Sequence, residues 1–228
     1  VALLFAPFVI ALLPEPAPGH ADAEDAGRAP QHLHLPTALL LFFLAFGGMA
    51  TFYMTPTLIP FHLEQLVSIS AAGTGFALSA ANMASGTAAL GYRRLRGVLP
   101  FSAITGLMLA MFALGYVGVA AADGYLTTMV ALGVAGFGLG LLIPNLNTWM
   151  LALAPAPLRG RLMGILGASF FLGQFASPLL SAPLVRGGTA SAFAAVGAGA
   201  GGVALCFLVY SAVDSARSRT TPSEQTAR

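Results

Sequence analysis

The sequence has 228 residues, of which 57% are hydrophobic and only 8% are charged, and its formal net charge is +2. A soluble domain carries about 25% charged residues, so this composition indicates a protein whose main solvent is hydrocarbon. The small net charge does not favour a nucleic-acid partner, and the single cysteine, Cys206, excludes both an internal disulfide framework and a metal site built from cysteines.

The chain begins with a short apolar run, Val1–Leu13, and a polar segment, residues 14–34, that is rich in proline and acidic residues. Two interpretations compete for the apolar run. It could be the core of a signal peptide, with a small-residue cleavage site at Gly19–Ala21. That interpretation lacks a basic leading region and would place most arginines outside the cell. We therefore expect residues 1–13 to be the remnant of a preceding transmembrane helix, and residues 14–34 to be a cytoplasmic linker.

Six uncharged runs follow, and each exceeds the ~20 residues that a spanning helix needs. Helices are expected because backbone polar groups in lipid must be paired within the element. Pro155 and Pro157 should end the fourth helix near Leu153. The six-helix unit would occupy residues 35–213, and residues 214–228 would form a disordered cytoplasmic tail. The runs are Leu35–Leu63, Val67–Tyr92, Val98–Ala122, Gly124–Leu158, Leu162–Val185 and Gly187–Val213.

All ten basic residues are arginines, and nine of them fall on one side of the predicted spans. Arg186 alone falls on the other side. Because cytoplasmic loops of membrane proteins carry an excess of positive charge, we expect both ends of the six-helix unit to be cytoplasmic. The sequence thus predicts a multi-pass protein of the cell inner membrane. The nine are Arg28, Arg93, Arg94, Arg96, Arg159, Arg161, Arg217, Arg219 and Arg228.

Several polar or amphipathic side chains interrupt the predicted spans, where they are costly unless they face a cavity or a partner. Either they line a substrate pathway or they join neighbouring helices by hydrogen bonds worth about 0.6 kcal/mol, up to about 1.7 kcal/mol. The sequence leaves both interpretations open for each residue, but we expect at least one to lie on the pathway. The candidates are Thr51, Tyr53, Asn82, Asn145, Trp149 and Gln174.

The remaining features of the spans predict packing and solvation. His62 and Glu64 lie near the outer end of the first span, where we expect both to be solvated. Pairs of glycines spaced four residues apart predict faces on which two helix backbones approach closely. These pairs are Gly136 with Gly140, Gly160 with Gly164, and Gly197 with Gly201.

Four stretches resemble the major facilitator superfamily of transporters. Gly86–Gly97 resembles the short basic loop between helices 8 and 9, although Leu90 stands where the family often has an acidic residue. Two further stretches, Pro144–Trp149 with the preceding Gly136–Gly140, and Pro157–Arg161, resemble helix 10 and its cytoplasmic loop. Leu172–Pro178 resembles helix 11 of bacterial drug and sugar efflux members.

The resemblance implies an all-α membrane protein with six transmembrane helices in two inverted three-helix repeats, forming one half of a twelve-helix fold. Tyr53–Pro56 and Pro144–Trp149 lie at matching places in the two repeats, as expected for a substrate cavity. The implied function is secondary transport of a small molecule by alternating access, with proton-coupled efflux. The implied partners are the lipid bilayer and the missing N-terminal six-helix half, within a full-length monomer. Neither a cofactor nor a metal is expected.

The inner-loop arginines admit two roles under this resemblance. They could close a cytoplasmic gate against the other half, or they could fix the topology and contact anionic lipid. The residues are Arg93, Arg94, Arg96, Arg159 and Arg161.

The sequence also bears on two other functional classes. Gly167–Ser169 resembles the serine motif of rhomboid proteases, but Phe170 replaces a glycine of that motif, and the histidines lie in the linker or near the outer surface. We therefore do not expect an intramembrane enzyme. A permease subunit of an ATP-driven importer also has about six helices, and it stays open as an alternative.

Overall fold

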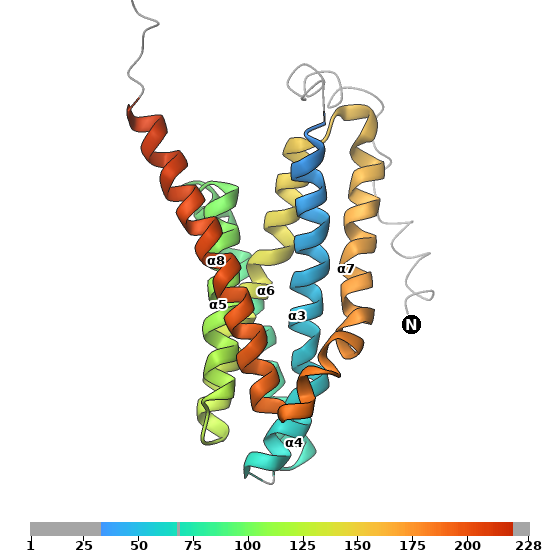
Figure 1. Ribbon diagram of the computed structural model, residues 1–228, viewed down its shortest axis with the longest axis vertical. Coiled ribbons are helices and arrows are strands. Elements are labelled where there is room, and N and C mark those ends of the chain that lie inside the picture. Colours follow the sequence, from blue (N-terminus) through green and yellow to red (C-terminus); the bar gives the residue numbers. More distant parts are fainter. Residues whose placement is uncertain (1–32, 68, 221–228) are drawn as a thin grey trace, which may run out of the picture.

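The computed structural model describes residues 33–67 and 69–220 and places nearly all of them in helices. Six long α-helices and two short 3-10 helices are joined by short connections, and the long helices run up and down beside one another (Figure 1). The elements are α3 (Leu35–Val67), α4 (Ala71–Arg96), α5 (Phe101–Ala120), α6 (Tyr125–Leu153), η1 (Ala156–Leu158), α7 (Arg159–Ser181), η2 (Leu184–Gly187) and α8 (Thr189–Thr220).

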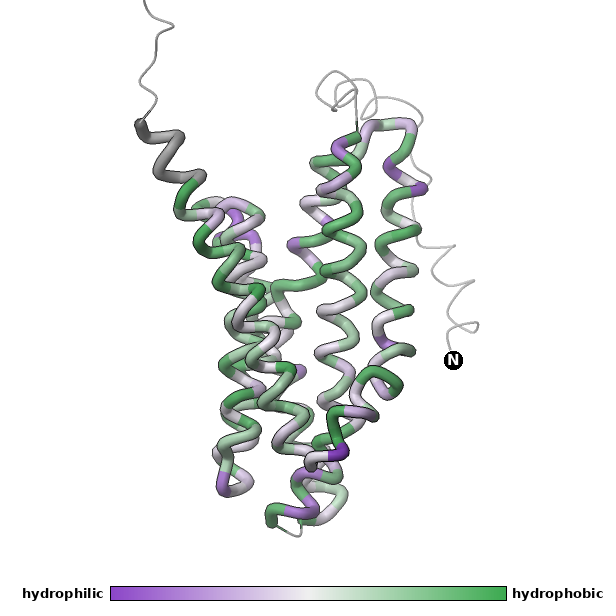
Figure 2. Tube along the Cα trace, in the orientation of Figure 1, coloured by the Kyte–Doolittle hydropathy of each residue, from purple (hydrophilic) through white to green (hydrophobic). Residues whose placement is uncertain are grey.

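Five of the long helices, α3, α5, α6, α7 and α8, are long and apolar enough to cross a membrane. Hydrophobic residues predominate along their lengths, while hydrophilic ones collect toward the two ends of the bundle (Figure 2). Helix α4 is also long enough, but it is rich in Gly, Ser and Thr and ends in three arginines. Five of the six predicted runs thus form helices that are candidate membrane spans, and a sixth span at α4 stays a prediction.

The helix boundaries follow the prolines. Helix α6 ends at Leu153, as predicted, two residues before Pro155. Helix α7 ends at Ser181, before the end of the uncharged run at Val185, because Pro183 cannot continue the hydrogen-bond ladder and the chain turns into η2. Helix α8 continues to Thr220, beyond the expected residue 213, through a stretch containing the good helix formers Ala and Arg. The predicted helix remnant at residues 1–13, almost all of the linker and residues 221–228 lie outside the described residues.

The helices associate in pairs. Helix α3 packs along α7, α4 packs along α6, and α5 packs along both α6 and α8. Gly136 and Gly140 of α6 allow a close approach to α4, because a Cβ atom at either would collide with a carbonyl oxygen, that of Ala81 or that of Ser85. The predicted close contact is confirmed at this pair of glycines.

The other two glycine pairs with a four-residue spacing differ from each other in their contacts. A Cβ at Gly197 of α8 would lie 3.0 Å from Val117 of α5, so this glycine also faces a neighbouring helix. Gly160 and Gly164 of α7 have no such neighbour within 4 Å of an added Cβ. The prediction of close helix contact at Gly160 and Gly164 is therefore wrong within the described residues, because both glycines lie on an exposed part of α7 near its beginning.

The arginines of the inner loops gather at one end of the bundle. The α4–α5 connection, η1 and the beginning of α3 lie at the top of Figure 1, together with the end of α8. Arg93, Arg94 and Arg96 in the last turn of α4 therefore share this end with Arg159 in the first turn of α7. We call it the arginine end. The α3–α4 and α5–α6 connections and η2, which contains Arg186, lie at the opposite end.

Candidate substrate site

A cavity of about 260 Å³ lies between α3 and α4, and we call it the α3–α4 cavity. It brings together two of the predicted site residues, Tyr53 of α3 and Asn82 of α4, which are far apart in the sequence. Neither α3 nor α4 contributes a charged side chain to its lining. The lining residues are Phe52, Tyr53, Thr55, Pro56, Leu78, Ala81 and Asn82.

The α3 wall of the cavity is shaped by a proline within the helix. Pro56 has no backbone N–H, so it removes the helical donor that would pair with the carbonyl oxygen of Phe52. Both residues line the cavity. Beside them, the Thr57 hydroxyl donates to the carbonyl oxygen of Tyr53 at 2.8 Å. The segment that the sequence places near a helix end lies within the continuous helix α3, where it combines a missing backbone donor with polar side chains that line the cavity.

Helix α5 supports this segment from behind. The hydroxyl of Tyr116, a fully buried residue, donates to the carbonyl oxygen of Thr51 at 2.7 Å. A phenol has one proton to donate, so the Thr55 hydroxyl is the donor in its 3.0 Å bond to the Tyr116 oxygen. These two bonds fix the turn of α3 just before Pro56. Sequence reasoning missed Tyr116, although a tyrosine within an apolar run signals that its hydroxyl needs a partner.

Helix α4 presents Asn82 to the cavity. The side-chain nitrogen of Asn82 donates to the carbonyl oxygen of Leu78, one turn earlier, at 3.0 Å. That bond uses one of the two amide hydrogens and leaves the amide oxygen and the other hydrogen able to meet a ligand. The preceding residue, Ala81, has its carbonyl oxygen against Gly136 of α6, so the close α4–α6 contact sets the position of this wall.

The other predicted pathway residues lie elsewhere. Thr51 is half-buried and lines two cavities on another side of α3, one toward α7 and one toward α8. Gln174 is half-buried on α7. Trp149 lies near the arginine end, where its ring stacks on Phe101 with centroids 5.5 Å apart, and it lines a further cavity of about 280 Å³.

Asn145 lies at a junction of three helices. It is fully buried, and its side-chain nitrogen donates to the Thr105 hydroxyl at 2.9 Å and to the Phe101 carbonyl oxygen at 3.3 Å, both on α5. Its amide oxygen accepts a longer bond of 3.4 Å from the Tyr92 hydroxyl of α4. Of the two interpretations that the sequence left open, this geometry favours the interhelical hydrogen bond for Asn145.

Near the C-terminal end of α3, one of two residues predicted to be solvated is buried. Glu64 is exposed, as expected, but His62 is buried, so the prediction that His62 is solvated is wrong. Its ring nitrogen Nδ1 lies 2.9 Å from the hydroxyl of Thr189, which begins α8. Its ring also meets Phe193 edge-on. The helix continues past His62 and brings it under α8, which the local sequence could not reveal.

Most arginine side chains at the arginine end are exposed to solvent. Arg93, Arg94 and Arg161 are exposed, whereas Arg96 and Arg159 are half-buried. The guanidinium of Arg96 lies 3.8 Å from the centre of the Phe101 ring, so a cation, a phenyl ring and the Trp149 indole stack in series.

Comparison with known proteins agrees with this architecture. A sequence profile described as Major Facilitator Superfamily matches residues 41–228. No curated protein matches the chain. Among solved structures, it is similar to a mutant of the peptide transporter POT in complex with sulfate, at 19% identity and a TM-score of 0.66. It is also similar to POT with sulfate, at 19% identity and 0.58, and to a POT mutant with alafosfalin, at 18% identity and 0.59.

These likenesses concern the fold. Each alignment covers 81% of this chain but only 40% of the solved transporter, so the chain spans less than half the length of the structures that it resembles.

Proposed function

The chain belongs to the Major Facilitator Superfamily, and from this we propose that it carries a small molecule across the membrane as one half of a twelve-helix secondary transporter. The family and the structural neighbours support transport over the intramembrane enzyme and over the ATP-driven importer. In this proposal, two inverted three-helix repeats, α3–α5 and α6–α8, alternate between two orientations against a second six-helix half. The complete protein acts as a monomer.

The α3–α4 cavity is the proposed substrate site of this half. The observation that carries the proposal is the meeting of Tyr53, Thr55 and Asn82 beside the proline-interrupted turn of α3. Polar groups in a spanning region are expensive, and Pro56 leaves one carbonyl oxygen of the continuous helix α3 without its helical donor. Thr51 and Gln174 lie outside this cavity and remain candidates for another part of the pathway, while Asn145 and Trp149 contact α5 and hold helices in position.

The chemistry of the cavity suggests a class of substrate. The seven described residues that line it are all uncharged, and their polar groups are a phenol, a hydroxyl and an amide. Phe52, Leu78 and Pro56 supply the apolar surface. We therefore propose a substrate whose part bound by this half is uncharged, with an apolar body and one or two hydrogen-bonding groups. An ionised group on such a molecule would have to be met by the other half.

The orientation in the membrane follows from the arginines. We propose that the arginine end faces the cytoplasm of a cell whose inner membrane contains the protein. Arg93, Arg94, Arg96, Arg159 and Arg161 would then border the cytoplasmic entrance, where they can contact the other half when the entrance closes. We further propose export in exchange for protons, which is supported by the resemblance of Leu172–Pro178 to efflux members. The proton-carrying group would belong to the other half.

A flux measurement tests this proposal. The full-length protein is reconstituted in liposomes, a pH gradient is imposed, and candidate substrates are screened for accumulation. Gradient-dependent flux of an uncharged or partly apolar compound is the expected result. Folded protein that moves none of the candidates under a gradient in either direction would refute proton-coupled export. Flux that requires ATP would instead favour the importer.

A further inference from the structure

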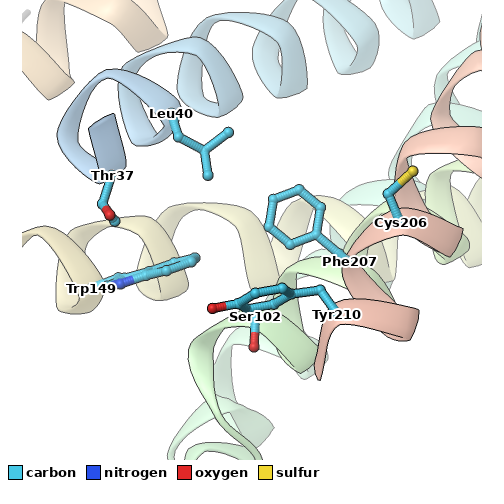
Figure 3. A pocket seen from close by; sticks show the side chains of 7 residues that line it. All are labelled: Thr37, Leu40, Ser102, Trp149, Cys206, Phe207 and Tyr210. Atoms are coloured by element: carbon cyan, nitrogen blue, oxygen red, sulfur yellow. The ribbon is translucent and has the colours of Figure 1, made fainter. Parts of the chain in front are cut away.

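Helices α3 and α8 belong to different proposed repeats, and their hydrogen bonds to each other lie at the end opposite the arginine end. Figure 1 shows α8 inclined away from α3 toward the arginine end. There a cavity of about 280 Å³ has Leu40 of α3 and Phe207 of α8 on its walls (Figure 3). At the other end, His62 and Gln65 of α3 bond to Thr189, the first residue of α8. No other hydrogen bond joins α3 to α8 among the described residues, so these bonds can control whether the two helices stay together.

The hydrogen bonds also determine which ring nitrogen of His62 carries the proton. The Thr189 hydroxyl has one proton, and it donates that proton to the side-chain oxygen of Gln65 at 3.3 Å. Its oxygen must then accept the hydrogen bond from Nδ1–H of His62, across 2.9 Å. A neutral imidazole has a single N–H, so Nε2 is left with a lone pair. A second proton would have to bind at Nε2.

The surroundings of Nε2 do not suit a second proton. His62 is only 5% exposed, and Nε2 is buried without a hydrogen-bond partner among the described residues. The Phe193 ring meets the imidazole edge-on, with centroids 5.8 Å apart. The backbone of Val119 in α5 lies within reach of the ring, but Nε2 makes no hydrogen bond to it. Because a buried cation without a full set of partners is costly, the charged ring is more stable where water can reach it.

No carboxylate in the described part of the chain offsets this cost. Glu64 and Asp123 are exposed at this end of the bundle, and neither bonds to the ring. Arg186 of η2 is exposed and is itself a cation. The positive end of α8 and the negative end of α5 both lie near the ring, so their dipoles oppose each other. The titratable side chains around this end, besides His62, are Glu64, Tyr116, Asp123, Tyr125 and Arg186.

His62 differs from the other side chains that bond the two proposed repeats to each other. Histidine changes its charge between about pH 5 and pH 8, whereas amides, hydroxyls and phenols do not. Among the described residues, a change of pH in this range therefore acts on these interhelical bonds through His62 alone. The other bonds between α3–α5 and α6–α8 use the side chains of Gln65, Tyr92, Thr105, Tyr125, Asn145, Ser177 and Thr189.

We propose that His62 is an acid-sensitive latch between α3 and α8. The neutral ring bonds to Thr189 and keeps the two helices together. Protonation at Nε2 favours a state in which the ring reaches water and the beginning of α8 has moved away from α3. In the proposed orientation this end faces away from the cytoplasm, so acid on that side would favour opening there.

The latch also has a route to the proposed substrate site. Phe193 of α8 contacts His62 and lies against Tyr116, with centroids 5.5 Å apart in the second pair. Tyr116 in turn bonds to Thr51 in the turn before Pro56. Movement of α8 away from α3 would thus remove a neighbour of the residue that supports this turn. The latch itself requires neither the proposed orientation nor transport of a substrate.

Spin labels can measure the separation of α3 and α8 directly. The full-length protein carries labels at Glu64→Cys and Ala194→Cys, both exposed positions, with Cys206→Ser and no other cysteine. The distance between the labels is measured in lipid vesicles without substrate, at about pH 8 and about pH 5, which bracket the titration of histidine. We expect the population at the short distance to fall severalfold at the lower pH. An unchanged population, or one that grows in acid, would overturn the proposal.

Two histidine variants assign the effect to this ring. His62→Gln retains an amide that can bond to Thr189 but cannot gain a proton, so its label distances should be the same at both pH values. His34→Gln is the matched control, because His34 is exposed near the arginine end and bonds to Thr37. It should keep the full response to pH. A response that persists in His62→Gln contradicts the proposal, whatever the distance from which that variant starts.

Thr189→Val tests the hydrogen bond without changing the histidine. Valine has a similar shape but cannot accept from Nδ1–H, so the short-distance population at about pH 8 should fall severalfold. Ser191→Ala removes a hydroxyl from the same turn of α8 that bonds only to the Gly188 carbonyl oxygen, and it should stay closed. Helical content from circular dichroism distinguishes separation of the helices from unfolding. A folded Thr189→Val protein as closed as the unmodified one would refute the latch, and a failure of transport would leave these distances interpretable.

Discussion

The hydroxyl of Tyr116 on α5 donates a 2.7 Å hydrogen bond to the carbonyl oxygen of Thr51 on α3. Thr51 lies about one turn before Pro56, where α3 loses a backbone donor. The bond attaches the proposed substrate segment to a helix that does not itself line the α3–α4 cavity. The bond joins two apolar runs that are far apart in the sequence, and the pattern of residues within either run does not predict it.

Removal of this hydroxyl is expected to loosen the turn of α3. Tyr116→Phe keeps the buried ring but leaves the Thr55 hydroxyl without its acceptor, and it should lower the unfolding free energy by about 1 kcal/mol. Unfolding in mixed micelles measures the loss. Tyr92→Phe is a suitable comparison because its bond to Asn145 is longer, at 3.4 Å, and a smaller loss is expected there. Equal losses would argue against a special role for Tyr116.

Asn82 is expected to contribute to substrate affinity and little to stability. Asn82→Ala removes the amide from the α3–α4 cavity and should weaken apparent substrate affinity about five- to tenfold, the value of one or two hydrogen bonds. Initial flux rates over a range of substrate concentrations give this quantity. Ser79→Ala is the control, since Ser79 is exposed on the same helix and bonds only to the Gly75 carbonyl oxygen. Affinity unchanged in Asn82→Ala would remove this cavity from the pathway.

The contact between α4 and α6 should not tolerate a single methyl group. Gly136→Ala would drive a Cβ into the Ala81 carbonyl oxygen and is expected to destabilise the protein by roughly 1–3 kcal/mol. At Gly133 on the same helix, an added Cβ meets nothing within 4 Å, so Gly133→Ala should be neutral or stabilising by up to about 1 kcal/mol. Thermal unfolding of the two variants compares them. A Gly136→Ala protein as stable as Gly133→Ala would mean that α4 stands farther from α6.

Asn145 and Thr105 should be energetically coupled. A double-mutant cycle with Asn145→Leu and Thr105→Val is expected to give a coupling energy of about 0.6 kcal/mol, and up to about 1.7 kcal/mol, from their 2.9 Å bond. The same cycle with Asn147→Leu in place of Asn145→Leu provides the control, because Asn147 lies on another side of α6. Additive effects of Asn145→Leu and Thr105→Val would show that this bond does not hold α6 to α5.

Orientation is tested by reporter fusions. A reporter that is active only in the cytoplasm should be active when fused after Gly97 at the arginine end, and inactive when fused after Asp123 at the opposite end. The reverse pattern would place the arginines outside and would invalidate the proposed cytoplasmic entrance.

Much of the bundle could be predicted because hydropathy and helix length act locally. Uninterrupted apolar stretches specify where a helix must form in lipid, and Pro155 with Pro157 locates the end of α6 near Leu153. The same reasoning failed at His62, which was expected in water and is buried against Thr189, because the residue that covers it comes from the distant helix α8.

At the candidate site, too, the sequence identifies individual residues but does not show which of them meet. Tyr53 and Asn82 were identified from sequence because polar groups in apolar runs are costly, but their meeting in one cavity depends on how closely α4 approaches its neighbours. Asn145 was identified by the same criterion and is instead bonded to α4 and α5. Polarity alone cannot distinguish these outcomes, since an amide can satisfy its hydrogen bonds with a ligand or with another helix.

The sequence by itself determined a helical membrane protein, the approximate limits of its helices and the gathering of arginines in alternate loops. Each follows from the cost of placing charge or unpaired backbone in hydrocarbon, which depends on residue type and chain position. Only the tertiary structure decided which faces meet. Gly136 and Gly160 begin identical four-residue spacings, yet one lies against a backbone carbonyl and the other is open, because close packing depends on the shape of both helices.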